Sequence, residues 1–394
     1  MPSAEYRAWG VVSVFEWARI ADVNFNRARE GLRVAEETAR FVFNDRELTL
    51  RVKDLRHRLS ELEARFPGGR RSLLLARDAA GDCTAGEVEE RPRRDLAGPN
   101  WKRVQEAVRV LEELARTFDG ELAHALKEIR FKAYTLEKEF AAEARRAALS
   151  RPGLYVIGGR ADTGGRSLLE AVREAARGGA HIYQLREKEA PAGEILPLAR
   201  ELRKLTAEMG LLFIVNDRLD IALACGADGV HLGQDDLPLA DARQVAGPGF
   251  IIGVSTHSLE QALAAEEGGA DYIGVGPVYP TATKPEYRAV GLDLVRTVAR
   301  RVSIPFVAIG GIDAASARAV VRSGARQLAV VRACFGAADI AAATGKLCAI
   351  IEEEFLNVAR TEGRQNRHDP DAPGPSRQDH PRDGKGGGRR AGRR

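Results

Sequence analysis

Apolar residues follow two different patterns along the chain. In the first part they recur every three or four positions over long stretches, which is typical of amphipathic helices. In the second part, short aliphatic and β-branched runs alternate with helical stretches, which predicts strand–helix units. The end of the chain is rich in Gly, Pro, Arg and Asp and cannot form a core. We therefore predict an all-helical segment (1–150), an α/β segment (151–356) and a disordered basic tail (357–394).

The helical segment contains an internal repeat. Residues 24–40 align with residues 100–116, an offset of 76, and nine of the 17 aligned positions are identical. Each copy begins with Asn, a residue that caps helix N-termini, so we expect helices to start at Asn24 and Asn100. The repeat predicts two similar helices packed about a pseudo-twofold axis.

Eight short apolar runs mark the α/β segment, and Gly-Ala pairs close several of the intervening helices. Eight strand–helix units in about 205 residues predict a (β/α)8 TIM barrel. A doubly wound sheet is the alternative, but eight units without a clear break favour closure. The predicted strands are residues 154–157, 181–185, 211–215, 229–232, 250–254, 272–275, 305–309 and 327–331.

Composition and charge limit the possible partners. The chain has 394 residues, 60 of them basic and 56 acidic, for a net charge of +4. The tail alone holds ten basic and five acidic residues, so we expect no specific nucleic-acid partner for the nearly neutral remainder. Every apolar run is shorter than the roughly 18 residues of a membrane span, so we expect no membrane association. Four scattered cysteines without a CxxC pair indicate free thiols in the cytoplasm.

In TIM barrels the working residues lie at the C-terminal ends of the strands. The second strand ends in Gln184, Arg186 and Lys188, which alternation points the same way. Two cations beside an amide suit a diphosphate, whereas an exposed charged surface is the alternative interpretation.

Carboxylates follow the next two strands. Asp217 comes after Asn216 at the end of the third strand, and Asp235 and Asp236 end the fourth. Oxygen ligands near phosphates, without cysteine, favour Mg²⁺ over zinc. For one of the two carboxylates after the fourth strand, the alternative is an N-cap on the next helix.

Hydroxyl groups and glycines follow the remaining strands. Ser255 is a candidate hydrogen-bond donor, the loop after the sixth strand is a candidate lid, and the backbone after the last two strands can bind a second phosphate. The lid candidates are Thr281, Thr283 and Lys284, and the backbone candidates for the second phosphate are Gly310, Gly311, Val331 and Arg332. No nucleophile paired with a general base is evident. Two anion sites therefore predict transfer of a group from a diphosphate to a phosphate-bearing nucleophile.

Residues 152–350 closely resemble thiamine-phosphate synthase. The matching motifs are QLREK (184–188), NDR (216–218), GADGVHLGQDD (226–236), GVSTH (253–257), GVGPVYPTATK (274–284) and AIGGI (308–312). The resemblance implies that hydroxymethylpyrimidine diphosphate condenses with thiazole phosphate, giving thiamine phosphate and diphosphate by a dissociative mechanism with Mg²⁺.

The same resemblance assigns roles to the matching positions. It implies Mg²⁺ ligands at Asp217 and Asp236, and catalytic roles for Ser255, Lys284 and Arg186. Substrate binding would involve Gln184, Arg186, Lys188, Asn216, Ser255, Thr281, Thr283, Lys284, Gly310, Gly311, Val331 and Arg332. Arg332 stands where a small residue is expected in this family.

The helical segment resembles the ThiD2 domain that is fused to some of these synthases. The matching stretches are residues 22–41, 55–59, 76–82 and 100–116. The resemblance implies ATP-dependent phosphorylation of hydroxymethylpyrimidine phosphate, although the segment has no P-loop. Candidate residues for its anion and Mg²⁺ sites are Asn24, Arg27, Arg29, Arg33, Asp78, Asp82, Arg103 and Arg109. The alternative is that these charges form ion pairs along exposed helix faces.

Two further interpretations stay open. The helical segment can instead be a dimerisation or regulatory module, which makes a homo-oligomer possible. The barrel can instead be a thiazole phosphate isomerase resembling TenI, which needs a single phosphate site. The predicted cations and carboxylates of a diphosphate site favour the synthase.

Overall fold

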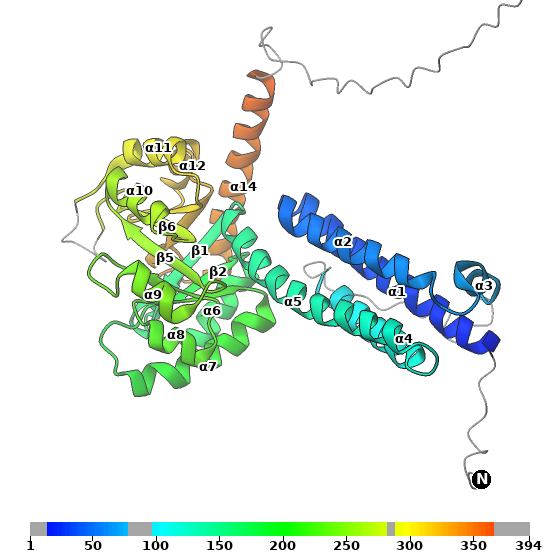
Figure 1. The fold of residues 1–394 in the computed structure, drawn as a ribbon. Helices are drawn as coiled ribbons and strands as arrows, with labels where there is room; N and C mark the ends of the chain where they lie inside the picture. Colours follow the sequence, from blue (N-terminus) through cyan, green and yellow to red (C-terminus); the bar gives the residue numbers. More distant parts are fainter. Residues whose placement is uncertain (1–13, 78–96, 282–287, 366–394) are drawn as a thin grey trace, which may run out of the picture.

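The computed structural model describes residues 14–77, 97–281 and 288–365. Its first part is helical, with α1 (Val14–Phe41), α2 (Arg46–Glu63), α3 (Gly69–Leu75), α4 (Gly98–Ala115) and α5 (Gly120–Ser150). Figure 1 shows these helices beside a barrel, with α5 leading from one to the other. Within the described ranges, no helix combines the length and the hydrophobicity that a membrane crossing needs.

Helices α1 and α4, which carry the two copies of the repeat, cross closely at Gly31. A Cβ atom at Gly31 would lie 2.8 Å from the Asn100 carbonyl oxygen and 2.7 Å from the Val104 side chain, so only glycine fits. The predicted helix start at Asn24 is wrong, because α1 begins at Val14 and the Asn24 side chain donates to the Ile20 carbonyl oxygen (2.8 Å). The apolar periodicity continues before the repeat, so the helix does too.

The second part is a closed parallel barrel in which β1 pairs with β8, and this confirms the predicted TIM barrel and excludes the doubly wound sheet. Its strands are β1 (Gly153–Gly158), β2 (Ile182–Leu185), β3 (Leu212–Asn216), β4 (Gly229–Leu232), β5 (Ile251–Thr256), β6 (Tyr272–Val275), β7 (Phe306–Ile309) and β8 (Gln327–Val330). The helical elements around it are η2 (Arg160–Thr163), α6 (Leu168–Arg177), α7 (Ala192–Met209), α8 (Leu219–Cys225), α9 (Leu239–Ala246), α10 (Leu259–Glu267), α11 (Gly291–Arg301), α12 (Ala317–Arg322), α13 (Arg332–Phe335) and α14 (Ile340–Gln365).

Helix α5 joins the helical segment to the N-terminal end of the barrel. Leu149 packs with the side chains of the barrel interior, and Gln327 at the start of β8 donates to the Leu149 carbonyl oxygen (2.7 Å). Arg146 of α5 forms an ion pair with Asp271 (3.1 Å), which directly precedes β6. The helical segment is thus held at the end of the barrel opposite the predicted site.

Helix α14 corrects the predicted start of the tail at residue 357, because the helix runs to Gln365. Buried Glu354 accepts hydrogen bonds from Arg318 (2.6 Å) and Arg322 (2.7 Å) of α12 and fixes the helix on the barrel. The rest of the predicted disordered tail, residues 366–394, lies outside the described residues.

Candidate active site

A cavity of about 400 Å³ opens at the C-terminal ends of the strands. Alternation along each strand directs every second side chain toward the barrel interior, so residues far apart in sequence meet there. The predicted site residues that line the cavity are Gln184, Arg186, Asn216, Ser255, Thr281, Gly310, Gly311, Val331 and Arg332.

The other predicted residues are placed differently. Lys188 is exposed beyond the end of β2 and is not among the residues that line the cavity. Asp217 and Asp236 are half-buried in the loops after β3 and β4. Thr283 and Lys284 lie outside the described residues.

The two glycines after β7 shape one wall of the cavity. Gly310 and Gly311 have φ values of +102° and +64°, a region that favours glycine. A Cβ atom on Gly310 would lie 2.4 Å from Pro277, and one on Gly311 would lie 2.7 Å from Tyr279. The loop after β6 therefore packs directly on this backbone, and the Tyr279 N–H donates to the Gly310 carbonyl oxygen (3.0 Å). No residue with a side chain fits here without a shift of the loop.

A chain of hydrogen bonds crosses the floor of the cavity. Gln184 Nε2 donates to the Tyr155 hydroxyl (2.8 Å), which lies 2.9 Å from the Tyr272 hydroxyl. Tyr272 lies 3.0 Å from His231 Nδ1, and His231 Nε2 lies 3.0 Å from Ser255 Oγ. The chain joins residues of five strands and links the two predicted site residues at its ends.

One assignment of the protons satisfies every link of this chain. In it Tyr155 donates to Tyr272, and Tyr272 donates to His231 Nδ1. His231 Nε2 then donates to Ser255 Oγ, which leaves the Ser255 hydroxyl proton for a ligand. Burial raises the pKa of Tyr155 and of Tyr272, so both stay protonated as this arrangement requires.

The sequence analysis missed Tyr155, His231 and Tyr272, although all three line the cavity. They stand inside the strands, among apolar residues, and not at the strand ends where catalytic residues were sought. A signal was present, since each is a polar or aromatic residue at an inward-facing position of a barrel strand.

The predicted metal ligands follow adjacent strands, since β3 and β4 pair with Asn216 opposite His231. Asp217 has a left-handed backbone (φ +62°), uncommon for a residue with a side chain, and its N–H donates to the His231 carbonyl oxygen (2.8 Å). Asp236 accepts from the Gly233 N–H (2.6 Å), and the N-cap of α9 is Pro238, so neither carboxylate after β4 caps that helix. In the described part of the chain no three His, Cys, Asp or Glu residues group into a metal site. Two carboxylates suit Mg²⁺, which takes its remaining ligands from phosphates and water.

Comparisons with known proteins decide the family. Residues 154–334 match the family model for thiamine monophosphate synthase. The thiamine-phosphate synthase of Gloeobacter violaceus is 46% identical over 326 residues, which are 82% of this chain and 93% of that protein. The enzyme of the same name from Nostoc punctiforme is 44% identical over 80% of this chain and 88% of its own length. The chain belongs to the thiamine-phosphate synthase family. Its membership confirms the resemblance predicted from the strand-end motifs, and it makes the protein a transferase of thiamine biosynthesis.

Two further comparisons each concern one part of the chain. Thiamine phosphate pyrophosphorylase from Pyrococcus furiosus is 45% identical and covers 52% of this chain and 98% of that chain, with a TM-score of 0.49. Residues 19–139 match the ThiD2 family, so this thiamine-phosphate synthase family member carries the predicted second module.

The candidate arginines of the helical segment that the structure describes have different partners. Arg33 pairs with Glu37 (2.8 Å) on α1, and Arg109 pairs with Glu113 (2.7 Å) on α4, as the alternative interpretation predicted. Arg27 and Arg103 are exposed at equivalent positions of the two copies. Arg29 instead reaches across to Glu63 of α2 (2.5 Å). Asp78 and Asp82 lie outside the described residues.

Proposed function

We propose that the barrel couples hydroxymethylpyrimidine diphosphate with thiazole phosphate in a Mg²⁺-dependent reaction. One observation carries the proposal: a single cavity presents a guanidinium and an amide on one side and backbone with positive φ on the other. Arg186 and Asn216 supply the first side, and Gly310 and Gly311 supply the second. An isomerase acting on one phosphate would need only one of these sides.

The reaction breaks the bond between the pyrimidine methylene carbon and the diphosphate oxygen. Arg186 balances the charge that develops on the leaving diphosphate, and exposed Lys188 follows two positions later in the loop after β2. The methylene cation is shared with the pyrimidine ring, which Gln184 and Ser255 orient from the two ends of the hydrogen-bond chain. The thiazole nitrogen then forms the new carbon–nitrogen bond. Mg²⁺, held by Asp217 and Asp236, supplies Lewis-acid stabilisation of the diphosphate when bound.

The test measures thiamine phosphate and diphosphate made by the purified chain from both substrates with Mg²⁺. We expect Asp217→Asn to reduce the rate by a factor of about 100 or more, because one charged metal ligand is lost. The matched control is Asp220→Asn, an exposed aspartate three residues away that pairs with Arg218. No diphosphate release from the unmodified chain would refute the function, and an unchanged rate in Asp217→Asn would refute the metal assignment.

We further propose that the helical segment phosphorylates hydroxymethylpyrimidine phosphate with ATP. The ThiD2 match over residues 19–139 supports this, since the product is the substrate proposed for the barrel. The full chain is incubated with ATP, Mg²⁺ and the pyrimidine monophosphate but without thiazole phosphate, so that the diphosphate accumulates. Its absence would favour the dimerisation or regulatory interpretation.

A further inference from the structure

The two halves of the helical segment repeat their aromatic contacts. In each half an aromatic residue of the repeat helix packs edge-on against a second ring, which comes from the loop after α2 in one half and from α5 in the other. That second ring meets a third, from the connection that follows the other repeat helix. The two sets are Phe25, Phe66 and Phe118 at the first end, and Trp101, Phe140 and Phe43 at the second end.

The halves also repeat their buried carboxylates. Glu36 accepts from Arg56 of α2 (2.8 Å), and Glu112 at the equivalent position accepts from Arg130 of α5 (2.9 Å). These shared pairs belong to the scaffold. Features that one half has and the other lacks are therefore the candidates for function.

The first end has a cavity of about 370 Å³ that is open to solvent. Half-buried Trp17 and the rings of Phe66 and Phe118 line it, together with Ala18 and Leu73. At the second end, Phe43 instead faces the C-terminal part of α5 and the barrel, in a cleft that includes Arg146 and Asp271. The first end therefore has an aromatic-lined cavity away from the barrel, whereas the cleft at the second end includes residues of the barrel.

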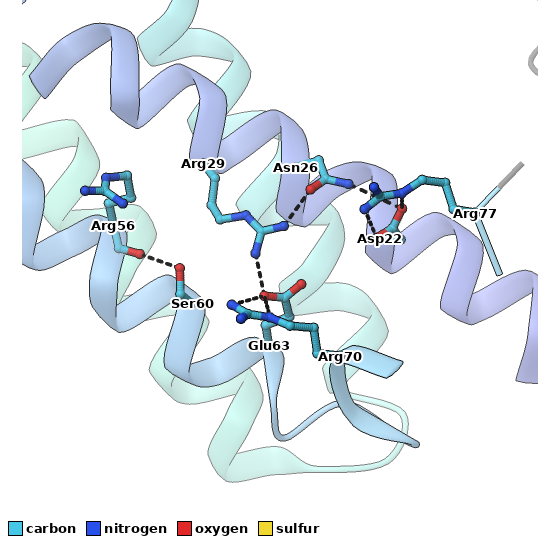
Figure 2. A network of polar contacts seen from close by, with 8 residues as sticks. All are labelled: Asp22, Asn26, Arg29, Arg56, Ser60, Glu63, Arg70 and Arg77. Carbon is cyan, nitrogen blue, oxygen red and sulfur yellow. Dashed lines mark hydrogen bonds and ion pairs between the residues drawn. The ribbon is translucent and has the colours of Figure 1, made fainter. Parts of the chain in front are cut away.

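The first end also has a charged network that the second half repeats only in part (Figure 2). Asp22, which is 2% exposed, receives two hydrogen bonds from Arg77, both 2.8 Å. Glu63, also 2% exposed, pairs with Arg29 and with Arg70.

The second repeat lacks the Asp22 part of this network, because Gly98 stands in its place. Lys102 and Gln105 replace Asn26 and Arg29, and both contact Glu137, which takes the place of Glu63 (3.6 and 2.6 Å). In the first half, three guanidinium groups share two carboxylates, so the network itself has a net positive charge.

The cavity and the network are neighbours along α1. Ala18 lines the cavity, and Asp22 and Asn26 of the network follow it in successive four-residue steps along the same face of the helix. The guanidinium side chains of Arg70 and Arg77 are 67% and 45% exposed, and each guanidinium has five N–H groups, more than its carboxylate partner accepts.

We propose that this end binds a phosphorylated aromatic heterocycle. The ring lies in the cavity against Trp17 and Phe118, and the phosphate lies on Arg70 and Arg77. The proposal rests on the proposed phosphorylation by the helical segment and places its substrate. The cavity volume is in the range of small-molecule sites, and both a pyrimidine phosphate and a nucleotide share the required chemistry.

Hydrogen–deuterium exchange of the full chain localises binding and keeps it apart from the barrel. The probes are hydroxymethylpyrimidine phosphate, a non-hydrolysable ATP analogue and inorganic phosphate, each added alone. We expect slower exchange in peptides that contain Trp17, Phe66 and Phe118. Slower exchange with the pyrimidine or with the nucleotide identifies the occupant, whereas no change with either, or the same change with inorganic phosphate alone, overturns the proposal.

Two variant pairs sharpen the test. Thr117→Trp fills the cavity from its exposed rim, and the control Val42→Trp places the same side chain at the equivalent exposed position of the second end. Arg70→Gln removes a phosphate donor while Arg29 still pairs with Glu63, and its control is Arg58→Gln.

We expect Thr117→Trp to abolish the protection, and Arg70→Gln to weaken binding by about 10- to 100-fold, as for loss of a charged hydrogen bond. The controls keep the protection of the unmodified chain. Equal protection in Thr117→Trp and Val42→Trp would overturn the site. Protection without formation of the diphosphate would refute the kinase and keep the site, and diphosphate formation without protection here would refute the site alone.

Discussion

Tyr272→Phe tests the hydrogen-bond chain on the cavity floor. The substitution removes one hydroxyl that lies 2.9 Å from the Tyr155 hydroxyl and 3.0 Å from His231 Nδ1. It keeps the ring, so the packing inside the barrel is unchanged. Both neighbours then lose a hydrogen-bond partner: the Tyr155 side chain is buried, and His231 is half-buried beside the cavity.

The size of the effect follows from that count. An unsatisfied buried polar group costs about 1–3 kcal/mol, so the loss at Tyr155 lowers the free energy of unfolding by that amount, and half-buried His231 adds a smaller loss. Tyr183→Phe is the matched control, because the Tyr183 hydroxyl donates to the Gly158 carbonyl oxygen, which also accepts from the Arg186 N–H. The control leaves no group unsatisfied and costs about 1 kcal/mol.

Urea unfolding followed by circular dichroism measures both variants, and thiamine phosphate formation measures the site. We expect Tyr272→Phe to lower the rate as well, since His231 is no longer held toward Ser255. Adding Tyr155→Phe to Tyr272→Phe should recover little stability, because the unsatisfied Tyr155 hydroxyl disappears but buried Gln184 Nε2 loses its acceptor. Equal destabilisation by Tyr272→Phe and Tyr183→Phe, with an unchanged rate, would refute the reasoning.

Three other predictions concern the barrel. Gly311→Ala should lower the free energy of unfolding by about 1–3 kcal/mol and weaken thiazole phosphate binding. The reason is that the backbone of Gly311 has φ +64° and a Cβ atom there would meet Tyr279. Urea unfolding measures the first effect, and the KM for thiazole phosphate measures the second. Burial, and then the charge of Arg151, lowers the pKa of His181 to about 4, below its unfolded value near 6.5. The stability from neutral His181 is therefore complete above pH 6.5 and is lost as the pH falls toward 4, by up to about 3 kcal/mol, and His181→Gln should flatten this dependence in urea titrations. Burial raises the pKa of Cys348 to about 12, so thiol reagents should label it slowly at pH 8 by mass spectrometry.

The barrel was predictable because its determinants are local. Strand runs, glycine caps and the polar residues directly after each strand are all visible in sequence. Parallel closure then brings the strand ends together whatever the details of packing. Gln184, Arg186 and Ser255 were identified in this way before any contact was known.

The interior chain was not predictable, because it depends on closure and register. Tyr155 and Tyr272 are 117 positions apart and meet only inside the closed barrel. A similar limit applies to the helical segment, where the repeat was visible but the partners of its charges were not. Arg29 looked like a surface residue of α1 until α2 placed Glu63 against it.

The attachment of the helical segment has a consequence for the order of reactions. Arg146, Leu149 and Gln327 hold α5 at the N-terminal end of the barrel, whereas the cavity opens at the C-terminal end. Between the two ends, the barrel interior is filled by packed side chains such as Tyr155, Ile182 and Leu212, so a diphosphate has no passage along the barrel axis. If the helical segment makes the pyrimidine diphosphate, a barrel in the same chain therefore receives it around the outside, through solvent. The fusion then acts by keeping the two activities at equal amounts and not by enclosing the intermediate.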